Sequence, residues 1–281
     1  MPFKAQQNKD FIIIDNRIKL TDDYFEKNKL KFKKITGSRF ASVLNQNKYT
    51  SPAKIWAIMT NLYYEEMDET LSKVGNIIEP KIKKYVEDKT NIKYKQYNPF
   101  EIKWDLFQTD KIFGGIPDGE PLDKNGNVNY SNDLPMLEIK TTSIDSFVYR
   151  TVNGTLRMQK DSNDIPLVKQ KNQKKESWYI NNEIVIPDEY KLQLSLYLYL
   201  RNITKGLFAI AFLEKEDYAF PEKFDVSKRT IELVKLDLDK DNFKQIIDYG
   251  INWYNNHIKE GLSPELSQQD ILWLKENNIN I

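Results

Sequence analysis

Apolar and polar residues alternate along segment 134–141, a pattern typical of a β-strand with two different faces. Leu137 and Ile139 would point to one face, and Glu138 and Lys140 to the other. One face of the predicted strand is therefore apolar, and the other places a carboxylate next to an ammonium group.

Further strands are predicted where apolar runs are bounded by turn residues. Asp15-Asn16 separates two such runs and predicts a hairpin, and Asn125-Gly126 predicts a second tight turn. The predicted strands, besides 134–141, are 11–14, 17–20, 91–96, 101–107, 206–213 and 229–238.

Helices are predicted where apolar residues recur at helical spacing. The segment 190–200 is ambiguous, because leucine occupies alternate positions as in a strand. The segment has no β-branched residue, however, and leucine is a good helix former, so we predict a largely buried helix in which Gln193 and Tyr197 share a face. The other predicted helices are 36–44, one from Ser51 to about residue 66, 69–89, 241–259 and a short one around 271–275.

Glu79 lies beside the apolar stripe of the predicted helix 69–89, between Gly75 and Pro80. A proline in the middle of a helix costs about 3 kcal/mol and removes a hydrogen bond. A glycine and a proline around an acidic residue therefore indicate that the local geometry matters. A solvated glutamate at a kink explains the same spacing equally well.

The charged face of strand 134–141 is a candidate site for metal-dependent chemistry. Asp118, in the preceding Pro117-Asp118 turn, and Glu138 can together hold a divalent ion, and Lys140 beside them can help to activate a water. The chain has no cysteine and one histidine, which excludes thiolate zinc sites and cysteine nucleophiles and disfavours multi-histidine sites. The carboxylates and lysines that remain favour magnesium.

The formal net charge of the chain is +1, so any nucleic-acid binding would depend on local patches rather than on a field over the whole surface. Segment 144–187 is one such patch, because it interleaves phosphate-neutralising basic residues with aromatic residues that can stack on bases. A solvated loop is the alternative interpretation. The residues concerned are Arg150, Arg157, Lys160, Lys169, Lys171, Lys174 and Lys175, with Phe147, Tyr149, Trp178 and Tyr179.

Two features bear on location. The first ten residues lack the apolar run of a signal peptide, and the longest apolar stretches are too short to cross a bilayer. We therefore expect a cytoplasmic protein that has no membrane among its partners.

The Pro117-Asp118 turn and the Glu138-Ile139-Lys140 strand resemble the PD and (D/E)XK elements of the PD-(D/E)XK nuclease superfamily. Three further segments resemble its lambda-exonuclease or YqaJ-like viral recombinase branch, and all of these elements follow one another in the family's order. The three segments are G-S-x-x-A-x-x-L at 37–44, G-x-x-x-E-P at 75–80 and Q-x-x-x-Y at 193–197.

The resemblance covers about 35–213 and implies an α/β (α+β) fold with a restriction-endonuclease-like three-layer core, in which helices flank a mixed β-sheet. Residues 1–34 would form an N-terminal hairpin and lead-in, and 214–281 a C-terminal strand and helices. Because no internal repeat or composition break is visible, we expect 1–281 to be a single nuclease domain.

The resemblance also implies a metal site. Asp118, Glu138 and the backbone carbonyl of Ile139 would bind Mg²⁺ or Mn²⁺. Glu79 would bind a second metal ion or orient a bound water. Hard oxygen donors of this kind suit both ions.

Other residues would act on water or substrate. Lys140 would position or deprotonate the attacking water, the latter only if its pKa is lowered. Gln193 would orient the scissile phosphate or Lys140. Ser38 and Arg39 are candidates for holding a terminal phosphate, and Tyr197 for contacting the substrate.

The activity implied by the resemblance is hydrolysis of DNA phosphodiester bonds to 5′-phosphate products, by a 5′-to-3′ exonuclease that acts on duplex ends in recombination or repair. Lambda-type members form a homo-oligomeric ring, a trimer, and work with a single-strand annealing protein. Three alternatives remain at this stage: an endonuclease of the same fold (restriction-type or RecB-like), a catalytically silent DNA-binding relative, and an unrelated α+β protein.

Overall fold

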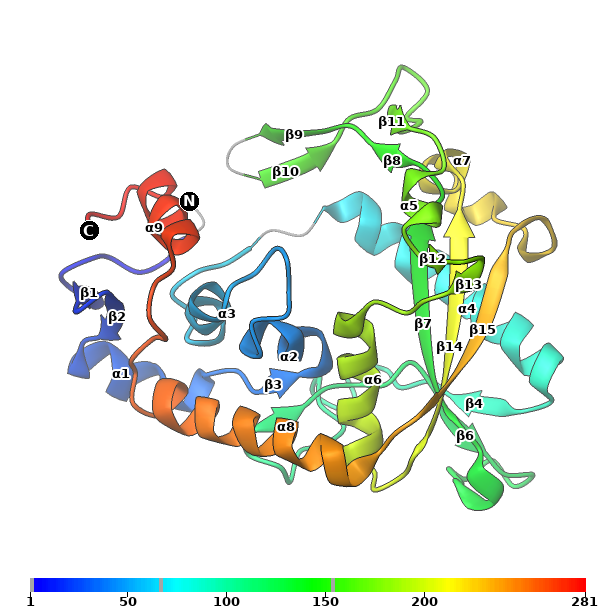
Figure 1. The fold of residues 1–281 in the computed structure, drawn as a ribbon, viewed down its shortest axis with the longest axis horizontal. Coiled ribbons are helices and arrows are strands. Elements are labelled where there is room, and N and C mark those ends of the chain that lie inside the picture. Colours follow the sequence, from blue (N-terminus) through cyan, green and yellow to red (C-terminus); the bar gives the residue numbers. More distant parts are fainter. Residues whose placement is uncertain (1–2, 66–67, 153–154) are drawn as a thin grey trace.

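A mixed sheet of three strands, in the order β15-β14-β7, forms the centre of one half of the molecule (Figure 1). The structure is a computed structural model that describes residues 3–65, 68–152 and 155–281. β7 (Met136–Ser143) runs parallel to β14 (Lys205–Leu213), and β15 (Ile231–Asp237) runs antiparallel to β14. β7 is thus the outer strand on one side of this sheet.

Helices cover both faces of the sheet. α4 (Glu69–Thr90) packs on one face, and α6 (Asp188–Leu200) packs on the other. The alternation of side chains along the strands divides them between two hydrophobic clusters. Strand residues in the α4 cluster are Leu137, Ile139, Leu207, Ala209, Ala211 and Leu213, and those in the α6 cluster are Met136, Phe208, Ile210 and Phe212. The predicted α/β class, a mixed sheet flanked by helices, is confirmed.

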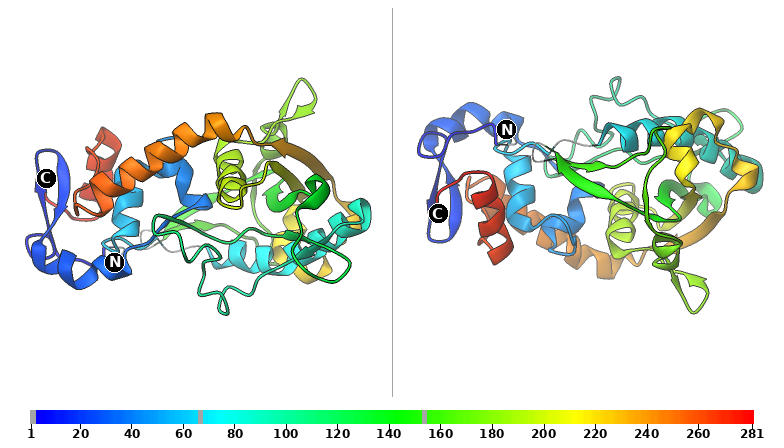
Figure 2. Two further views of the ribbon diagram at one scale, coloured as in Figure 1. Left: turned by 90° about the horizontal axis from the view of Figure 1, so that it is seen from below. Right: turned by 90° about the horizontal axis from the view of Figure 1, so that it is seen from above.

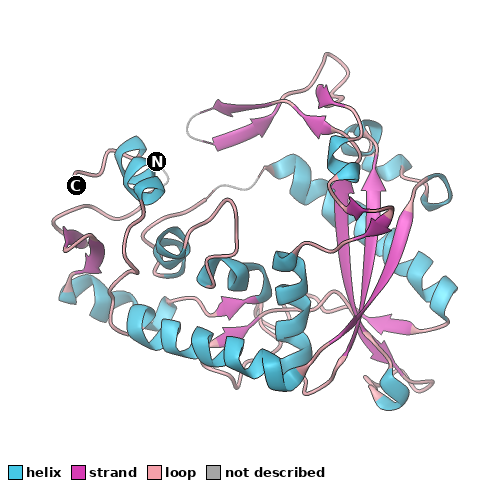
Figure 3. Cartoon of the chain, in the orientation of Figure 1, coloured by secondary structure: helices cyan, strands magenta, loops and turns pink. Residues whose placement is uncertain are grey.

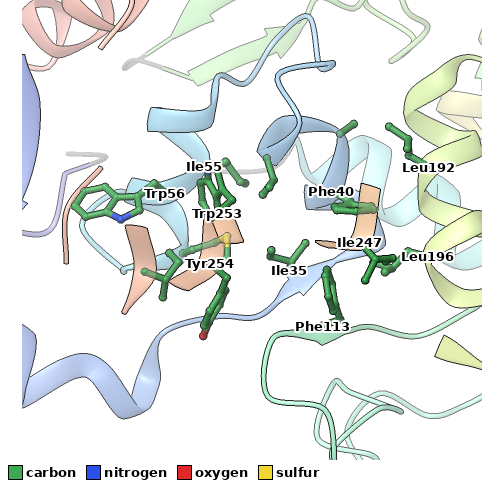
Figure 4. Packing of buried hydrophobic residues seen from close by; sticks show 14 of the residues in the cluster. Ile35, Phe40, Ile55, Trp56, Phe113, Leu192, Leu196, Ile247, Trp253 and Tyr254 are labelled. Atoms are coloured by element: carbon green, nitrogen blue, oxygen red, sulfur yellow. The ribbon is translucent and has the colours of Figure 1, made fainter. Parts of the chain in front are cut away.

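The other half of the molecule is mainly helical, as Figure 3 shows. Side chains from α2 (Gly37–Val43), α6 and α8 (Lys240–Trp253) meet around the buried ring of Phe40 (Figure 4). Phe40 packs edge-to-face on Phe113, with ring centroids 5.8 Å apart, and close packing at Gly250 lets α8 approach both rings. This cluster joins α6, which covers the sheet, to the helical half.

The remaining elements are short. No helix in the described part of the chain is long and apolar enough to cross a membrane. The remaining strands are β1 (Phe11–Ile14), β2 (Arg17–Leu20), β3 (Ile35–Thr36), β4 (Lys93–Lys95), β5 (Phe113–Gly114), β6 (Glu120–Leu122), β8 (Ser146–Phe147), β9 (Tyr149–Val152), β10 (Thr155–Met158), β11 (Val168–Gln170), β12 (Tyr179–Ile180) and β13 (Glu183–Ile184). The remaining α-helices are α1 (Asp22–Asn28), α3 (Pro52–Met59), α5 (Gln173–Glu176), α7 (Lys215–Ala219) and α9 (Gln268–Glu276), and a π-helical turn (Tyr254–Ile258) extends α8.

Most of the predicted elements are confirmed, including the first hairpin, helix 190–200 and the three strands of the main sheet. α4 continues through Pro80 as a single helix. The helix that begins after Ser51 was predicted to reach about residue 66, but it ends at Met59. The chain leaves the helix there because Asn61 adopts φ +63° and Leu62 N–H turns back to the carbonyl of Ala57.

The predicted strand 101–107 is wrong, because the chain forms hydrogen-bonded turns there. Lys103 and Trp104 have φ of +52° and +62°, which a strand cannot accommodate. The Trp104 amide donates to the carbonyl of Pro99 at 2.7 Å, which closes the turn. Asp105 then ends the segment by accepting hydrogen bonds from the Phe107 and Gly115 amides.

Gly115 precedes the Pro117-Asp118 turn and has φ +130°, a conformation that residues with a side chain rarely adopt. A Cβ atom at this position would lie 2.6 Å from the hydroxyl oxygen of Tyr197. The loop that leads to Asp118 can therefore pass close to α6 only with glycine at this position.

We expect Gly115→Ala to lower the free energy of unfolding by about 3 kcal/mol, because it adds a steric clash to an unfavourable φ. Gly126→Ala is the matched control: Gly126 also has positive φ (+79°), but a Cβ added there would have no atom within 4 Å. The control should lose only about 1 kcal/mol. Urea unfolding of the two variants measures the difference, and equal losses would contradict the role of the Tyr197 contact.

Candidate active site

Three side chains form a closed set of hydrogen bonds on the α6 side of β7. Glu138 Oε1 accepts from Lys140 Nζ at 2.8 Å and from Gln193 Nε2 at 2.6 Å. Lys140 Nζ also donates to Gln193 Oε1 at 3.1 Å. β7 supplies Glu138 and Lys140 because they are two residues apart on one face of the strand, and α6 supplies Gln193. The structure therefore brings together three of the residues that the sequence singled out.

Asp118 joins this group at the outer edge of β7. A bridge between Gly119 and Leu137 aligns the turn with the strand, and Asp118 Oδ2 accepts a hydrogen bond from the Ile139 amide at 2.7 Å. In a strand, the N–H and C=O of one residue point to the same side. The carbonyl of Ile139 is thus directed to the edge on which Asp118 lies.

Glu79 reaches the same place from the other face of the sheet. Its neighbour Ile78 is fully buried in the α4 cluster with Leu137 and Ile139, which fixes the helix against β7. Gly75, one turn earlier, leaves room for the glutamate, because a Cβ there would lie 3.1 Å from Glu79 Oε1. The charge of Glu79 is close enough to affect the titration of Glu138.

Burial and mutual repulsion raise the pKa values of the acidic groups. The pKa of Glu138 rises to about 8, because the group is buried and lies near Asp118. The pKa of Glu79 rises to about 7 for the same two reasons. Burial also raises the pKa of Asp118, although Lys140 and the Ile139 amide act in the opposite direction. Three carboxylates that resist ionisation at one place form a site that favours added positive charge.

Lys140 is the cation within this group. Burial tends to lower its pKa, but the carboxylates of Glu138 and Asp118 outweigh burial, and the net shift is upward. In the metal-free protein Lys140 is thus an ammonium that can donate hydrogen bonds. To act as a base, Lys140 would need a lowered pKa, and in the metal-free protein its pKa is not lowered.

The donor set fits a hard divalent cation. Glu138 Oε2 is buried and has no hydrogen-bond partner, which is costly for a carboxylate oxygen unless a cation binds it. No three acidic or histidine side chains among residues 3–65, 68–152 and 155–281 form a metal cage by themselves. An ion bound by Glu138, Asp118 and the Ile139 carbonyl would therefore keep several waters, as Mg²⁺ commonly does.

Tyr197 lies inside the protein beside this site, with 3% of its surface exposed. Its ring stacks on Phe107, and its hydroxyl oxygen faces the backbone amides of Gly37 and Ile116. A Cβ at Gly37 would lie 2.6 Å from Gln193 Cγ. Tyr197 thus joins the start of α2 to the loop that carries Asp118, and close packing at Gly37 holds α2 against Gln193.

Ser38 and Arg39 lie at the start of α2. The Ser38 hydroxyl is exposed and lies 3.2 Å from the hydroxyl of Thr36. Arg39 Nη1 donates to the carbonyl of Lys34 at 2.9 Å. Lys33 adds to this positive charge, and its pKa is lowered by burial and by repulsion from Arg39 and Lys4.

Two residues at the site were not singled out from the sequence. Lys33 is one, although its position just before the 37–44 segment could have indicated it. Tyr190 is the other: Lys140 Nζ lies 4.9 Å from the centre of its ring, and the ring stacks on buried Trp178. The i, i+3 spacing of Tyr190 and Gln193 on α6 was the available signal.

A second polar group connects the Asp118 segment to α6. Glu120 is fully buried and accepts two hydrogen bonds from Arg201, at 2.6 and 3.0 Å. The hydroxyls of Tyr97 and Tyr130 also donate to Glu120. The strand just after Asp118 is thereby fixed to the C-terminal end of the helix that carries Gln193.

The raised pKa of Glu79 predicts a pH-dependent cost in stability. Its folded-state value of about 7 exceeds the usual 4.5, so the cost is fully present above pH 7 and disappears as the pH falls below the unfolded value. We expect metal-free Glu79→Gln to be more stable than wild type by about 2 kcal/mol at pH 8.5 and by much less at pH 5. Thermal unfolding in EDTA at both pH values measures this, and a difference independent of pH would contradict it.

Comparisons with known proteins support the family resemblance. The model of the YqaJ-like viral recombinase domain matches residues 28–204. The chain is 53% identical over 280 residues to the uncharacterized protein MG373 of Mycoplasma genitalium, and 50% identical over 280 residues to its Mycoplasma pneumoniae homolog. Each alignment covers 99% of this chain and 100% of the relative.

Among solved structures, an alkaline exonuclease from Laribacter hongkongensis is similar at 13% identity and a TM-score of 0.48, covering 92% of this chain and 98% of that one. A phage related exonuclease from Haemophilus somnus is similar at 12% identity and a TM-score of 0.45, covering 83% of this chain and 99% of that one. The family model spans well over half of the sequence and includes every motif of the site. The chain therefore belongs to the family of YqaJ-like viral recombinase domains.

Proposed function

We propose that this protein is a metal-dependent deoxyribonuclease that hydrolyses phosphodiester bonds, as a 5′-to-3′ exonuclease acting on duplex ends in recombination or repair. One observation carries most weight: Glu138, Lys140 and Gln193 are linked by hydrogen bonds beside Asp118, while Glu138 Oε2 is buried without a partner. Membership of the YqaJ-like family supports the same conclusion.

Asp118, Glu138 and the carbonyl of Ile139 would hold Mg²⁺ or Mn²⁺, with Glu79 holding a second ion or a water. When bound, the ion supplies charge that lowers the pKa of a coordinated water and offsets the negative charge developing on the phosphate oxygens. Bound positive charge would also remove the mutual repulsion that raises the carboxylate pKa values.

The ammonium group of Lys140 would donate hydrogen bonds to the attacking water or to a phosphate oxygen. Two neighbours fix its direction: the Gln193 carbonyl oxygen accepts from Nζ at 3.1 Å, and the Tyr190 ring lies beneath it at 4.9 Å. Gln193 binds Glu138 through its other amide atom, so it holds the carboxylate and the ammonium in one geometry. Tyr197 would act as a positioning residue, because its hydroxyl is buried against the backbone.

The positive charge near α2 would receive a terminal phosphate. Burial lowers the pKa of Lys33, repulsion from Arg39 and Lys4 lowers it further, and a phosphate dianion would relieve that repulsion. The exposed hydroxyl of Ser38 would add a hydrogen bond. Because α2 packs directly against Gln193, an end phosphate held here would lie beside the catalytic group.

The wider assignments also belong to this proposal. We propose that residues 1–281 act as one nuclease domain in the cytoplasm, on DNA duplex ends. A homo-oligomeric ring and a single-strand annealing partner are the assembly and the partner that the family resemblance implies.

We expect magnesium-dependent degradation of linear duplex DNA, with closed circular DNA spared. Lys140→Ala should lower the rate by about 100-fold or more, because the ammonium would stabilise charge in the transition state. The assay compares 5′-labelled linear and circular substrates, with wild type and variant, in Mg²⁺ and in EDTA.

The outcomes of this assay separate the alternatives. Cutting of the circle would instead assign an endonuclease of the same fold. Failure of wild type to hydrolyse either substrate with any divalent metal would reject the enzyme and leave a DNA-binding relative.

We also expect wild type to degrade 5′-phosphorylated ends faster than 5′-hydroxyl ends. Lys33→Gln should reduce this preference about tenfold, since it removes one charge from the proposed phosphate site. Lys31→Gln is the matched control, because Lys31 is exposed in the same segment but does not contribute to the shifted pKa of Lys33. Equal rates on the two kinds of end in wild type would show that this region does not bind the terminal phosphate.

A further inference from the structure

Three side chains along one side of α6 contact the site or the chain that carries Asp118. They are Gln193, Tyr197 and the capping residue Arg201, which follow one another at intervals of four residues and so lie on neighbouring turns of the helix. Gln193 belongs to the hydrogen-bonded set described above, and the other two contact the Asp118 segment. In Figure 2, α6 (yellow-green) lies on one side of the sheet and α4 (cyan) on the other. The Asp118 segment is thus held from the α6 side.

The contacts of Tyr197 and Arg201 fall on either side of Asp118. The Tyr197 hydroxyl faces the amide of Ile116, two residues before Asp118. Arg201 donates two hydrogen bonds to Glu120, two residues after Asp118, at 2.6 and 3.0 Å. Asp118 itself lies in a bend between β5 and β6, outside both strands. The position of its carboxylate therefore depends on how its two flanks are held.

Both oxygens of the Glu120 carboxylate are occupied by the protein. Oε1 accepts from Arg201 Nε and from the Tyr130 hydroxyl, and Oε2 accepts from Arg201 Nη2 and from the Tyr97 hydroxyl. The group is fully buried, and four charge-assisted hydrogen bonds compensate for its burial. Glu138 differs, because its Oε2 has no partner. Glu120 thus has no free oxygen for a cation, and its contacts serve to hold the segment after Asp118.

Arg201 is fixed by more than its partner carboxylate. Its guanidinium lies 5.1 Å from the centre of the Phe107 ring, and that ring stacks on Tyr197. Its backbone amide donates to the Tyr197 carbonyl at the end of α6. A planar guanidinium that makes two hydrogen bonds to one carboxylate and lies over an aromatic ring has a closely defined position. A lysine there would keep the charge but lose this paired geometry.

We propose that Arg201 and Glu120 are positioning residues that set the affinity of the site for its metal ion, by holding Asp118 where it can bind the ion together with Glu138. This inference rests on the proposed function and assigns a role to a pair that touches neither ion nor substrate. Asp118 meets the edge of β7 through its contact at 2.7 Å with the Ile139 amide, so a shift of the bend would move its carboxylate away from Glu138. Partners that orient metal ligands typically cost about 10- to 100-fold in metal affinity or activity when they are lost.

A second buried pair of the same kind separates this role from a general contribution to stability. Arg229 donates two hydrogen bonds to Asp217, at 2.7 and 3.0 Å, and Asp217 is 3% exposed. Asp217 belongs to α7, and Arg229 lies two residues before β15, so neither flanks a proposed metal ligand in the sequence. Arg229→Lys is therefore the matched control for Arg201→Lys.

The test is Mn²⁺ binding to the DNA-free protein, measured by isothermal titration calorimetry. Arg201→Lys should weaken binding about tenfold, because the bend that carries Asp118 is held less closely. Tyr130→Phe removes one hydrogen bond from Glu120 and keeps the ring, so this milder variant should weaken binding about threefold. Arg229→Lys should bind Mn²⁺ as wild type does. Urea unfolding of all three variants reports what each substitution costs the fold.

The Mg²⁺ dependence of DNA hydrolysis provides a second readout. Arg201→Lys should need about tenfold more Mg²⁺ for half-maximal rate, whereas Lys140→Ala should be slow at every Mg²⁺ concentration. Wild-type Mn²⁺ affinity in both Arg201→Lys and Tyr130→Phe, or an equal loss in Arg229→Lys, would overturn the inference and leave the proposed function intact. Absence of Mn²⁺ binding by wild type would reject the metal-dependent function and this inference with it.

Discussion

The burial of the Glu138 carboxylate is the constraint on which the rest of the site depends. A fully buried carboxylate is unfavourable unless positive charge or hydrogen bonds compensate for it. One oxygen is compensated within the protein by Lys140 and Gln193, and the other is not. The protein thus satisfies one oxygen of this group, and the proposed metal ion would bind the other. Burial is also the main reason that Asp118 and Glu79 resist ionisation.

The position of β7 at the edge of its sheet explains how the site is assembled. An inner strand would have neighbours on both sides, and Asp118 could not reach its backbone. At the edge, the Ile139 amide is available to Asp118, and α4 can bring Glu79 around from the opposite face. Side chains from both helical layers and from the preceding turn therefore meet at this one strand.

The sequence predicted the parts of this arrangement that depend on local patterns. Alternation along 134–141 placed Glu138 and Lys140 on one face. Helix formers without β-branching, together with the family resemblance of the Q-x-x-x-Y segment, predicted α6 correctly despite its alternating leucines. Segment 101–107 was predicted wrongly because its apolar residues suggest a strand, whereas distant contacts of Asp105 with Gly115 and Lys34 determine its path. Glu120 was not recognised because its role arises from tertiary contacts, which spacing along the chain does not reveal.

The contacts of Glu120 with Arg201, Tyr97 and Tyr130 have a mechanical consequence. They join the segment after Asp118 to the end of α6, while Tyr197, one turn earlier on the same helix, joins the segment before Asp118 to it. Two sets of contacts consequently hold the segment that carries Asp118 to the helix that carries Gln193. Glu79 lies on the other face of the sheet, on α4, whose capping residue Asp68 accepts a hydrogen bond from the Met158 amide. The distance between Asp118 and Gln193 is therefore set independently of Glu79, because none of these contacts involves α4.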